Sequence, residues 1–226
     1  MVNTLLSPIG IFGGTFDPIH FGHLRLAQEL AVGLGFGQVR FIPAGHPPHR
    51  AKPRTPALHR LEMVRLAIAG NPLFVLDDRE VLKETASYTV ETLQDLRSEL
   101  GSDVPLCLNM GADAFLALTT WHQWRSLFDL AHIVVAHRPG FPQATWADGM
   151  PHALQEQLNL RLNHDPKSLN SSPAGAIMTH VITPLDISAS HIRMELQAGI
   201  SPRYLLPDVV LDYIHTNHLY ADVYGT

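Results

Sequence analysis

One stretch decides the fold of this chain: Gly13-Gly14-Thr15-Phe16-Asp17-Pro18-Ile19-His20-Phe21-Gly22-His23-Leu24. A short apolar run, residues 9–12, comes directly before it. After it, apolar residues recur at three- and four-residue spacing as far as Leu34, which is the spacing of one face of a helix. The pattern therefore predicts a strand, a tight loop and a helix in succession.

The loop of this unit is predicted to hold an anion. Gly13 and Gly14 can take backbone conformations closed to other residues and let a ligand approach bare amides. The helix is expected to begin near Gly22, where unpaired N–H groups and the positive end of the helix dipole favour phosphate. His20 and His23 can then place both imidazoles on the phosphate side of the turn, as donors to developing negative charge.

The histidine pair has other readings. The sequence contains 14 histidines, so a purely structural His20 stays open. A zinc pair is a second alternative, but a structural zinc site needs four ligands and no cysteine lies nearby, so we predict no protein-held metal. The spacing also departs from G-x-G-x-x-G, the pattern that binds a dinucleotide pyrophosphate. The combination of Gly-Gly, His-x-Gly-His and a strand–loop–helix setting is more specific than any one of these features.

Residues 13–23 resemble the first motif of the nucleotidyltransferases that carry (H/T)xGH, and the wording GGTFDPIHFGH is similar to that of bacterial nicotinate-nucleotide adenylyltransferases. The resemblance implies transfer of the adenylyl group of ATP to nicotinate mononucleotide, giving nicotinate adenine dinucleotide and pyrophosphate. The residues that it places on ATP here are Gly13, Gly14, Thr15, Phe16, His20 and His23; both histidines are catalytic, and Phe16 also faces the mononucleotide.

Composition limits the classes of protein to which the chain can belong. The chain has 226 residues, is 46% hydrophobic and carries a net charge of −5, so bulk attraction to nucleic acid or to an anionic membrane is not expected. Cys107 is the only cysteine, which excludes an intramolecular disulfide and fits a reducing compartment. No secretory leader and no run of 18 apolar residues is found, so we expect a cytoplasmic protein. A homo-oligomer stays open.

Strand and helix patterns alternate along the whole chain. We expect a single α/β domain over residues 1–226, built as a Rossmann-like, doubly wound parallel sheet with helices on both faces. Residues 141–173, where the pattern weakens, are read as an insertion or a mobile segment. The helix expected over 56–69 is interpreted as scaffold, and the charged residues 77–84 are expected to be exposed. The expected strands after the first are 38–44, 73–76, 105–110, 131–136 and 176–182.

Several segments near expected strand ends favour the mononucleotide half of a site. Pro47-Pro48-His49-Arg50 resembles a family segment near the substrate phosphates, although a solvated loop would look the same. Ser87 or Thr89 can cap the next helix; the resemblance places Ser87-Tyr88-Thr89 on the mononucleotide. Trp121 and His122 resemble a Thr-Trp-Tyr/His element in which the tryptophan flanks the pyridine ring; such aromatics are also common in cores. Arg138, past a strand end, suits phosphate or a plain surface position.

Two further segments favour the ATP half. Gly111 and Asp113 follow an apolar strand, where Asp113 can accept from ribose hydroxyls or cap a helix. Ser188, Ser190 and Arg193 cluster at an expected helix start, with Arg193 on the same face as Ser190. They resemble the family's Ile-Ser-Ser/Ala-Thr-x-Ile-Arg motif, which implies a clamp on the outer phosphates with Arg193 catalytic; an N-cap serine and a solvated arginine are the alternative.

Magnesium is the only cofactor expected, bound to the ATP phosphates without a protein cage. The partners implied are ATP and nicotinate mononucleotide. Two rival functions stay open: an adenylyltransferase that prefers nicotinamide mononucleotide, and a nucleotide-binding sensor module that kept the loop without catalysis.

Overall fold

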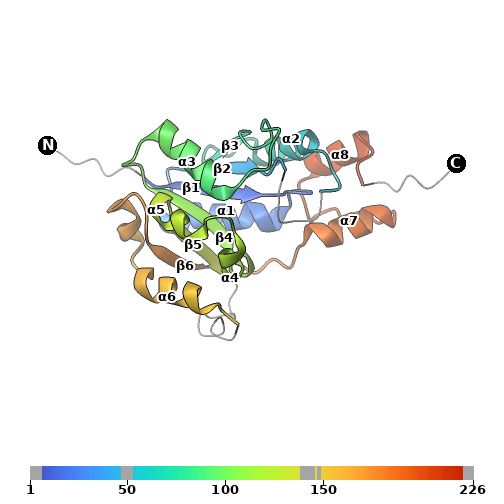
Figure 1. The fold of residues 1–226 in the computed structure, drawn as a ribbon. Helices are drawn as coiled ribbons and strands as arrows, with labels where there is room; N and C mark the ends of the chain where they lie inside the picture. Colours follow the sequence, from blue (N-terminus) through green and yellow to red (C-terminus); the bar gives the residue numbers. More distant parts are fainter. Residues whose placement is uncertain (1–6, 47–52, 138–145, 147–148, 221–226) are drawn as a thin grey trace.

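The computed structural model of the protein describes residues 7–46, 53–137, 146 and 149–220. Six parallel strands form one sheet in the order β3-β2-β1-β4-β5-β6 (Figure 1). The strands are β1 (Ile9–Gly14), β2 (Gln38–Pro43), β3 (Phe74–Leu76), β4 (Leu106–Gly111), β5 (His132–His137) and β6 (Ile177–Val181). The α-helices are α1 (Phe21–Leu34), α2 (Ala57–Ile68), α3 (Thr89–Leu100), α4 (Ala112–Leu116), α5 (Leu127–Leu130), α6 (His152–Arg161), α7 (Ala189–Gln197) and α8 (Asp208–Thr216). The short 3₁₀ helices whose bounds fall within the described residues are η1 (Leu118–Thr120), η2 (Trp124–Ser126) and η4 (Pro166–Asn170).

The strand order reverses between β1 and β4. β1 pairs with β2 along its whole length, from Ile9 to Gly14, but its register with β4 ends at Ile11. The last three residues of β1 therefore separate from β4 at the carboxyl edge of the sheet. In open α/β sheets this reversal point is where ligands bind, because the two connections leave in opposite directions.

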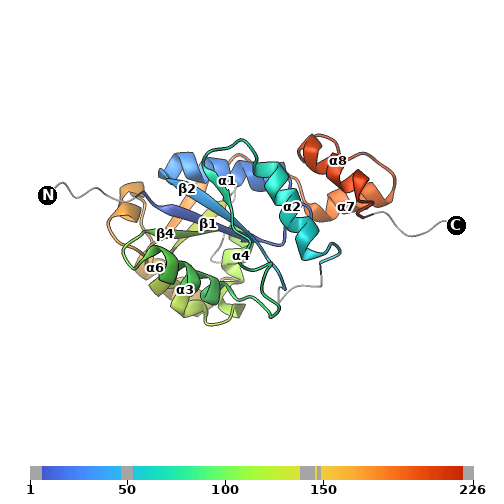
Figure 2. The ribbon, with the colours of Figure 1, turned by 90° about the horizontal axis from the view of Figure 1, so that it is seen from above.

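Helices cover both faces of the sheet, as Figure 2 makes clear for α1 on one side and α3 and α6 on the other. One apolar core joins the sheet to α1, α2, α7 and α8, and the second joins it to α3, α4, α5 and α6. The doubly wound fold expected from the sequence is confirmed. In both views α7 and α8 lie together at one end of the molecule.

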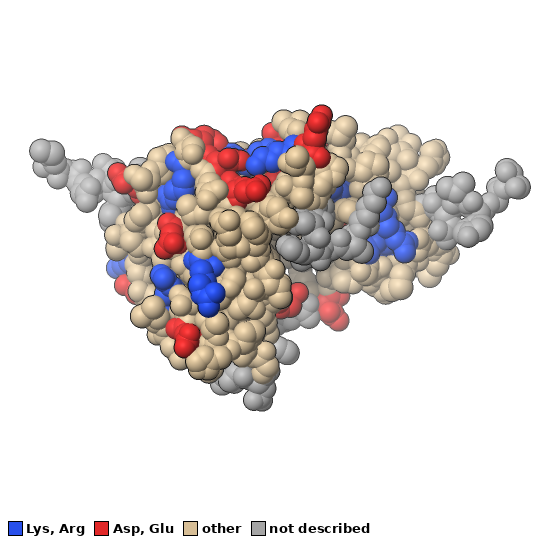
Figure 3. Space-filling view, in the orientation of Figure 1, with Lys and Arg blue, Asp and Glu red and all other residues tan. Residues whose placement is uncertain are grey.

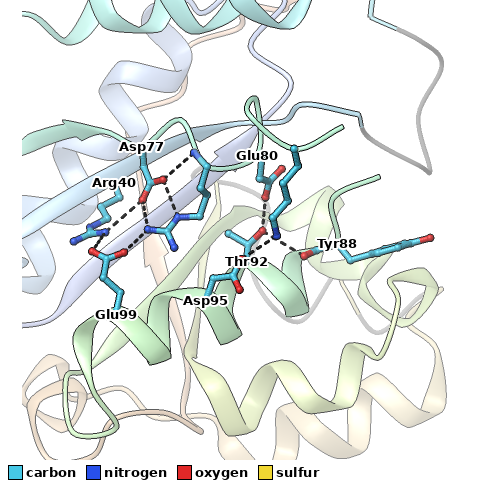
Figure 4. A network of polar contacts seen from close by, with 9 residues as sticks. Arg40, Asp77, Glu80, Tyr88, Thr92, Asp95 and Glu99 are labelled. Atoms are coloured by element: carbon cyan, nitrogen blue, oxygen red, sulfur yellow. Dashed lines mark hydrogen bonds and ion pairs between the residues drawn. The ribbon is translucent and has the colours of Figure 1, made fainter. Parts of the chain in front are cut away.

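The segment between β3 and α3 corrects an expectation. The charged residues 77–84 are not simply exposed: Asp77 accepts from Arg79 and lies with Glu99 between Arg79 and Arg40, as Figure 4 shows. The Asp77 side chain is only 8% exposed. In Figure 3 acidic and basic side chains gather together over α3 and β3, so opposite charges neutralise one another there.

Two helical segments add detail. The cap expected from Ser87 or Thr89 is not formed: Tyr88 occupies the N-cap of α3 and makes no side-chain cap bond. Within residues 141–173, the described part forms α6 and η4, with Leu154, Leu158 and Leu169 buried. In the described part of the chain, no helix is both long and apolar enough to cross a bilayer.

Candidate active site

A cleft of about 1290 Å³ opens at the carboxyl edge of the sheet, where β1 and β4 separate. Its walls come from the β1–α1 loop, the segment before α3, the β4–α4 junction and the start of α7. Of the residues predicted to form the site, those that line it are Gly13, Gly14, Thr15, Phe16, His20, His23, Thr89, Gly111, Asp113, Trp121, His122, Ser188, Ser190 and Arg193. Residues 170 positions apart in sequence therefore share one cavity.

The glycine pair works differently from the expectation. Neither Gly13 nor Gly14 has a positive φ; the left-handed residue of the loop is Phe16, at φ 49°. A Cβ on Gly14 would lie 2.9 Å from the Phe16 ring, so this glycine makes room for that side chain. A Cβ on Gly13 would meet nothing closer than 4.0 Å, and Gly13 is exposed to the cleft. Its missing side chain leaves space for a ligand.

Phe16 contributes backbone rather than ring surface. Its side chain is 2% exposed and packs edge-on against Phe12, at 5.6 Å between ring centroids, and against His23, at 5.1 Å. The aromatic ring belongs to the core. Phe16 nonetheless lines the cleft, so we expect a substrate to approach its backbone rather than its ring.

His20 and His23 stack on each other at the N-terminus of α1. Their ring centroids are 3.8 Å apart, and the His20 amide donates to Nδ1 of His23 at 3.3 Å. His20 is 6% exposed, and burial lowers the pKa of its imidazole to about 4. His20 is therefore neutral at pH 7 and can donate through one ring nitrogen.

The start of α7 presents its hydroxyl and guanidinium groups to the same cavity. Ser188 is the N-cap, its hydroxyl accepting from the His191 amide at 3.2 Å. Arg193 donates to the Ser190 hydroxyl at 3.2 Å and to the backbone carbonyl of Asp17 at 2.7 Å. The second of these bonds ties the late motif directly to the early one, and it holds the guanidinium in place before any ligand arrives.

The β4–α4 junction forms another wall. Asp113 is exposed in the first turn of α4, and a Cβ on Gly111 would lie 2.7 Å from its carboxylate oxygen. Gly111, not Asp113, is the N-cap. The capping role considered for Asp113 is thus not the one it has, and its carboxylate is left facing the cleft.

Aromatic side chains also line the cavity. The Tyr88 and His122 rings lie 4.5 Å apart, and Trp121 is partly buried beside them. Trp124, three residues later, is buried in the core. Three predicted residues, His49, Arg50 and Arg138, fall outside the described residues.

Comparison with known proteins gives the family. A family model described as cytidylyltransferase-like matches residues 11–195. A protein of Dechloromonas aromatica (strain RCB), named probable nicotinate-nucleotide adenylyltransferase, is 56% identical over 95% of this chain and 98% of its own. A relative with the same name from Acidithiobacillus ferrooxidans is 49% identical over 93% of this chain and 94% of its own. The chain belongs to the nicotinate-nucleotide adenylyltransferase family.

Solved structures agree with this family at the level of the fold. A structure described as the Plasmodium falciparum nicotinic acid mononucleotide adenylyltransferase complexed with NaAD aligns with a TM-score of 0.71 at 18% identity. The alignment covers 95% of this chain and 97% of that one. The nicotinate-nucleotide adenylyltransferase fold therefore extends over nearly the whole molecule.

Asp17 is a residue of the site that the sequence did not single out. It is 5% exposed, and its carboxylate accepts from the Tyr220 hydroxyl at 2.6 Å and from the Arg54 amide at 2.9 Å. These bonds fasten the β1–α1 loop of this nicotinate-nucleotide adenylyltransferase family member to two distant segments. The aspartate within the motif was visible in the sequence, but its partners were not.

Arg60 is the second residue that sequence reasoning missed. The helix that carries it was read as scaffold, yet Arg60 is 1% exposed and donates to three backbone carbonyls beside the cleft. A signal was present: Arg60, Met63, Val64 and Ile68 form the buried stripe of α2. An arginine on an apolar stripe indicates a buried partner.

Glu80 is the third. It lines the cleft, and its carboxylate accepts from the Thr92 hydroxyl at 2.6 Å (Figure 4). Burial is the main cause that raises the pKa of this carboxyl, with the Thr92 bond acting in the opposite direction. Because Asp77 to Glu84 looked like a solvated run, nothing in the sequence distinguished Glu80 from its charged neighbours.

The described residues hold no cluster of three or more His, Cys, Asp or Glu side chains suited to a metal ion. At the phosphate end, the Asp17 carboxylate already has both oxygens engaged. The groups that remain there are imidazole, hydroxyl, guanidinium and amide, which suit phosphate better than magnesium.

Proposed function

We propose that the protein transfers the adenylyl group of ATP to nicotinate mononucleotide, releasing pyrophosphate and forming nicotinate adenine dinucleotide. One observation carries the proposal: the His20/His23 turn and the Ser190/Arg193 turn line a single cleft and are joined by the bond from Arg193 to the Asp17 carbonyl. The names of relatives 45–56% identical to the chain support the substrates.

The reaction is an in-line displacement at the α-phosphorus of ATP. An oxygen of the mononucleotide phosphate forms the new P–O bond with its own electron pair, and the bond to pyrophosphate breaks, so that pyrophosphate leaves with the electrons. The attacking oxygen is already anionic, so no protein nucleophile is required. The protein acts by positioning the two phosphates and stabilising the charge on the α-phosphoryl group.

We assign the roles by position in the cleft. Gly13 gives the phosphates access to the loop amides, including that of Phe16, while His20 and His23 donate to the α-phosphoryl oxygens. Because His20 is neutral, its contribution is a hydrogen bond rather than a full positive charge. Arg193, with Ser190 beside it, neutralises the departing pyrophosphate.

The two nucleosides take opposite walls. Gly111 and Asp113 face the ATP side, where the exposed Asp113 carboxylate can accept from ribose hydroxyls. Thr89, Trp121 and His122 lie on the mononucleotide side, where Trp121 can stack on the pyridine ring. For His49, Arg50 and Arg138 the phosphate-binding roles remain proposals from sequence alone.

Magnesium enters the proposal as part of the ATP substrate. When bound to the phosphates it neutralises negative charge that the cleft side chains do not cover. The Asp17 carboxylate accepts from the Arg54 amide and the Tyr220 hydroxyl, which supports an ion carried by the substrate rather than one held by this residue. We extend the proposal to the cytoplasm, since the only thiol, Cys107, is buried and unpaired.

A pyrophosphate-release assay tests the proposal. The purified protein is mixed with MgATP and, in parallel, with nicotinate mononucleotide, nicotinamide mononucleotide or no acceptor. We expect release with the nicotinate compound above the other two. Faster release with the nicotinamide compound would reassign the acceptor, and binding of ATP without release in any arm would replace the enzyme by the sensor module.

A further inference from the structure

Arg60 reaches from α2 to the underside of the loops that shape the cleft. Its Nε donates to the Thr55 carbonyl at 3.1 Å, one terminal nitrogen donates to the Thr15 carbonyl at 2.7 Å, and the other donates to the Gly45 carbonyl at 3.1 Å. With 1% exposure, the guanidinium is out of contact with solvent, and it does not line the cleft. It therefore cannot touch a substrate.

The buried charge has partners on the neighbouring elements. Burial lowers the pKa of Arg60, while the nearby Asp17 carboxylate acts in the opposite direction. Asp17 belongs to the same loop as Thr15, so the guanidinium holds that loop both through a carbonyl and through a nearby carboxylate. An arginine can satisfy three carbonyls at once because its donors form a planar fork, which a lysine cannot reproduce.

The bond to Thr15 fixes the direction of the next amide. The Thr15–Phe16 peptide is trans, since the only cis bond in the described residues is Asp17–Pro18. In a planar trans peptide the C=O and N–H point in opposite directions. When the Thr15 carbonyl faces Arg60, the Phe16 N–H must face away from it. Phe16 lines the cleft although its side chain is buried, and its φ of 49° turns the backbone at that point.

We propose that Arg60 is a positioning residue that aims the Phe16 amide at the phosphates of the nucleotide. The three carbonyls bring together the β1–α1 loop, the second residue after β2 and a residue just before α2, so one side chain sets the rim of the phosphate end. The amide, not the arginine, contacts the anion. This inference rests on the proposed function and names a residue through which that site is held in order.

Arg97 is a matched control. It is also an arginine that donates to backbone carbonyls, namely those of Leu130 and Pro173, each with a bond of 2.7 Å. It lies on α3 and does not line the cleft. Its loss should lower stability without moving the phosphate loop.

The first test compares Arg60→Lys and Arg60→Gln with Arg97→Lys and Arg97→Gln, each assayed for pyrophosphate release well below its melting temperature. We expect kcat to fall roughly 10- to 100-fold in the Arg60 variants, with KM for the mononucleotide within about threefold. The Arg97 variants should keep kcat within about twofold. If the Gln variant does not fold, the Lys variant decides. An Arg60→Lys enzyme with wild-type kcat overturns the inference, and so does an equal loss of kcat in the Arg97 set.

The second test needs no turnover. The amide resonance of Phe16 is followed by NMR while MgATP is added to the wild type and to Arg60→Lys. We expect a large shift in the wild type and a much smaller one in the variant. If the wild type shows this shift but releases no pyrophosphate, the proposed reaction fails and the role of Arg60 stands. A Phe16 amide that ignores MgATP in the wild type overturns the inference.

Discussion

His20 shows how burial changes what a motif residue can do. The sequence predicts two imidazoles as donors beside a phosphate, and the structure stacks them and removes His20 from solvent. A doubly charged stack would repel itself, and the lowered pKa of His20 avoids this. A neutral donor suits the proposed reaction, in which Arg193 and ATP-borne magnesium are expected to neutralise most of the transition-state charge.

Replacing His20 by alanine should lower kcat roughly 10²- to 10³-fold, the scale of losing one oxyanion donor, because the imidazole donates to the α-phosphoryl oxygen only as charge develops there. Steady-state pyrophosphate release measures this. His215→Ala, at an exposed position on α8, is the control and should keep full activity. A His20→Ala enzyme within threefold of the wild type would refute the catalytic role.

The same imidazole should make stability depend on pH. Its pKa falls from 6.5 to about 4 on folding, so the unfolded chain binds more protons between these values. The free energy of unfolding therefore rises with pH through this window and is lost as the pH falls toward 4. Between pH 7 and pH 4.5, His20→Asn should lose about 2 to 3 kcal/mol less than the wild type. Urea unfolding at the two pH values measures the free energy of unfolding of both proteins. An equal loss in the wild type and in His20→Asn would contradict the prediction.

At the scale of elements, periodicity in the sequence was sufficient to place strands and helices but not to place buried polar contacts. The alternation of Gln38 to Ala44 and the apolar run before Gly111 predicted β2 and β4 almost to the residue. The same kind of reasoning treated residues 77–84 as solvated, because a charged run looks alike whether its partners are water or other segments. Arg40 and Glu99, which engage Asp77 and Arg79, come from two other elements.

Glu80 offers a test at this scale, since its bond to Thr92 fastens the β3–α3 segment to α3. Its raised pKa means that the folded protein binds more protons than the unfolded chain above pH 4.5. Stability contributed by this carboxyl therefore falls as the pH rises toward the folded pKa. Glu80→Gln, which keeps the acceptor oxygen, should gain stability relative to the wild type from pH 5 to pH 8.

Glu99→Gln is the matched control for that experiment. Arg79 and Arg40 lower the pKa of Glu99, so this variant should lose stability at neutral pH, and the loss should shrink in acid. Chemical denaturation across the pH range measures both variants. If both variants gain stability, or both lose it, relative to the wild type at neutral pH, the assigned causes of the two pKa shifts are wrong.

At the scale of the whole molecule, the fold reconciles an acidic chain with a phosphate site. The net charge is −5, yet the cleft gathers Arg193, two helix N-termini and the loop amides at one edge of the sheet. The sequence predicted many of the residues that line the cleft, since motif order along a parallel sheet brings strand ends together. It could not predict the partners of Arg60 and Tyr220, because Thr15 and Asp17 lie 45 and 203 residues away from them.

The assignment of the two substrates to opposite walls of the cleft can be tested with two substitutions. Trp121→Ala should raise KM for nicotinate mononucleotide by roughly 5- to 50-fold, as expected for losing one stacked ring, with a smaller effect on KM for ATP. Ser190→Ala, at the other wall, should do the reverse. Initial rates with each substrate varied in turn give both constants. Equal changes for both substrates in either variant would contradict the assignment of the walls.

The hydrogen bond between Tyr220 and Asp17 has a consequence for how the protein is made. The loop that begins the cleft leaves the ribosome early, whereas the side chain that fastens it is added 203 residues later. At ordinary rates of translation that interval is roughly 10 to 40 s. During synthesis this loop therefore lacks its hydrogen bond to Tyr220 until the end of the chain has been made. A chain interrupted before Tyr220 would contain every motif residue but not the side chain that holds the loop through Asp17.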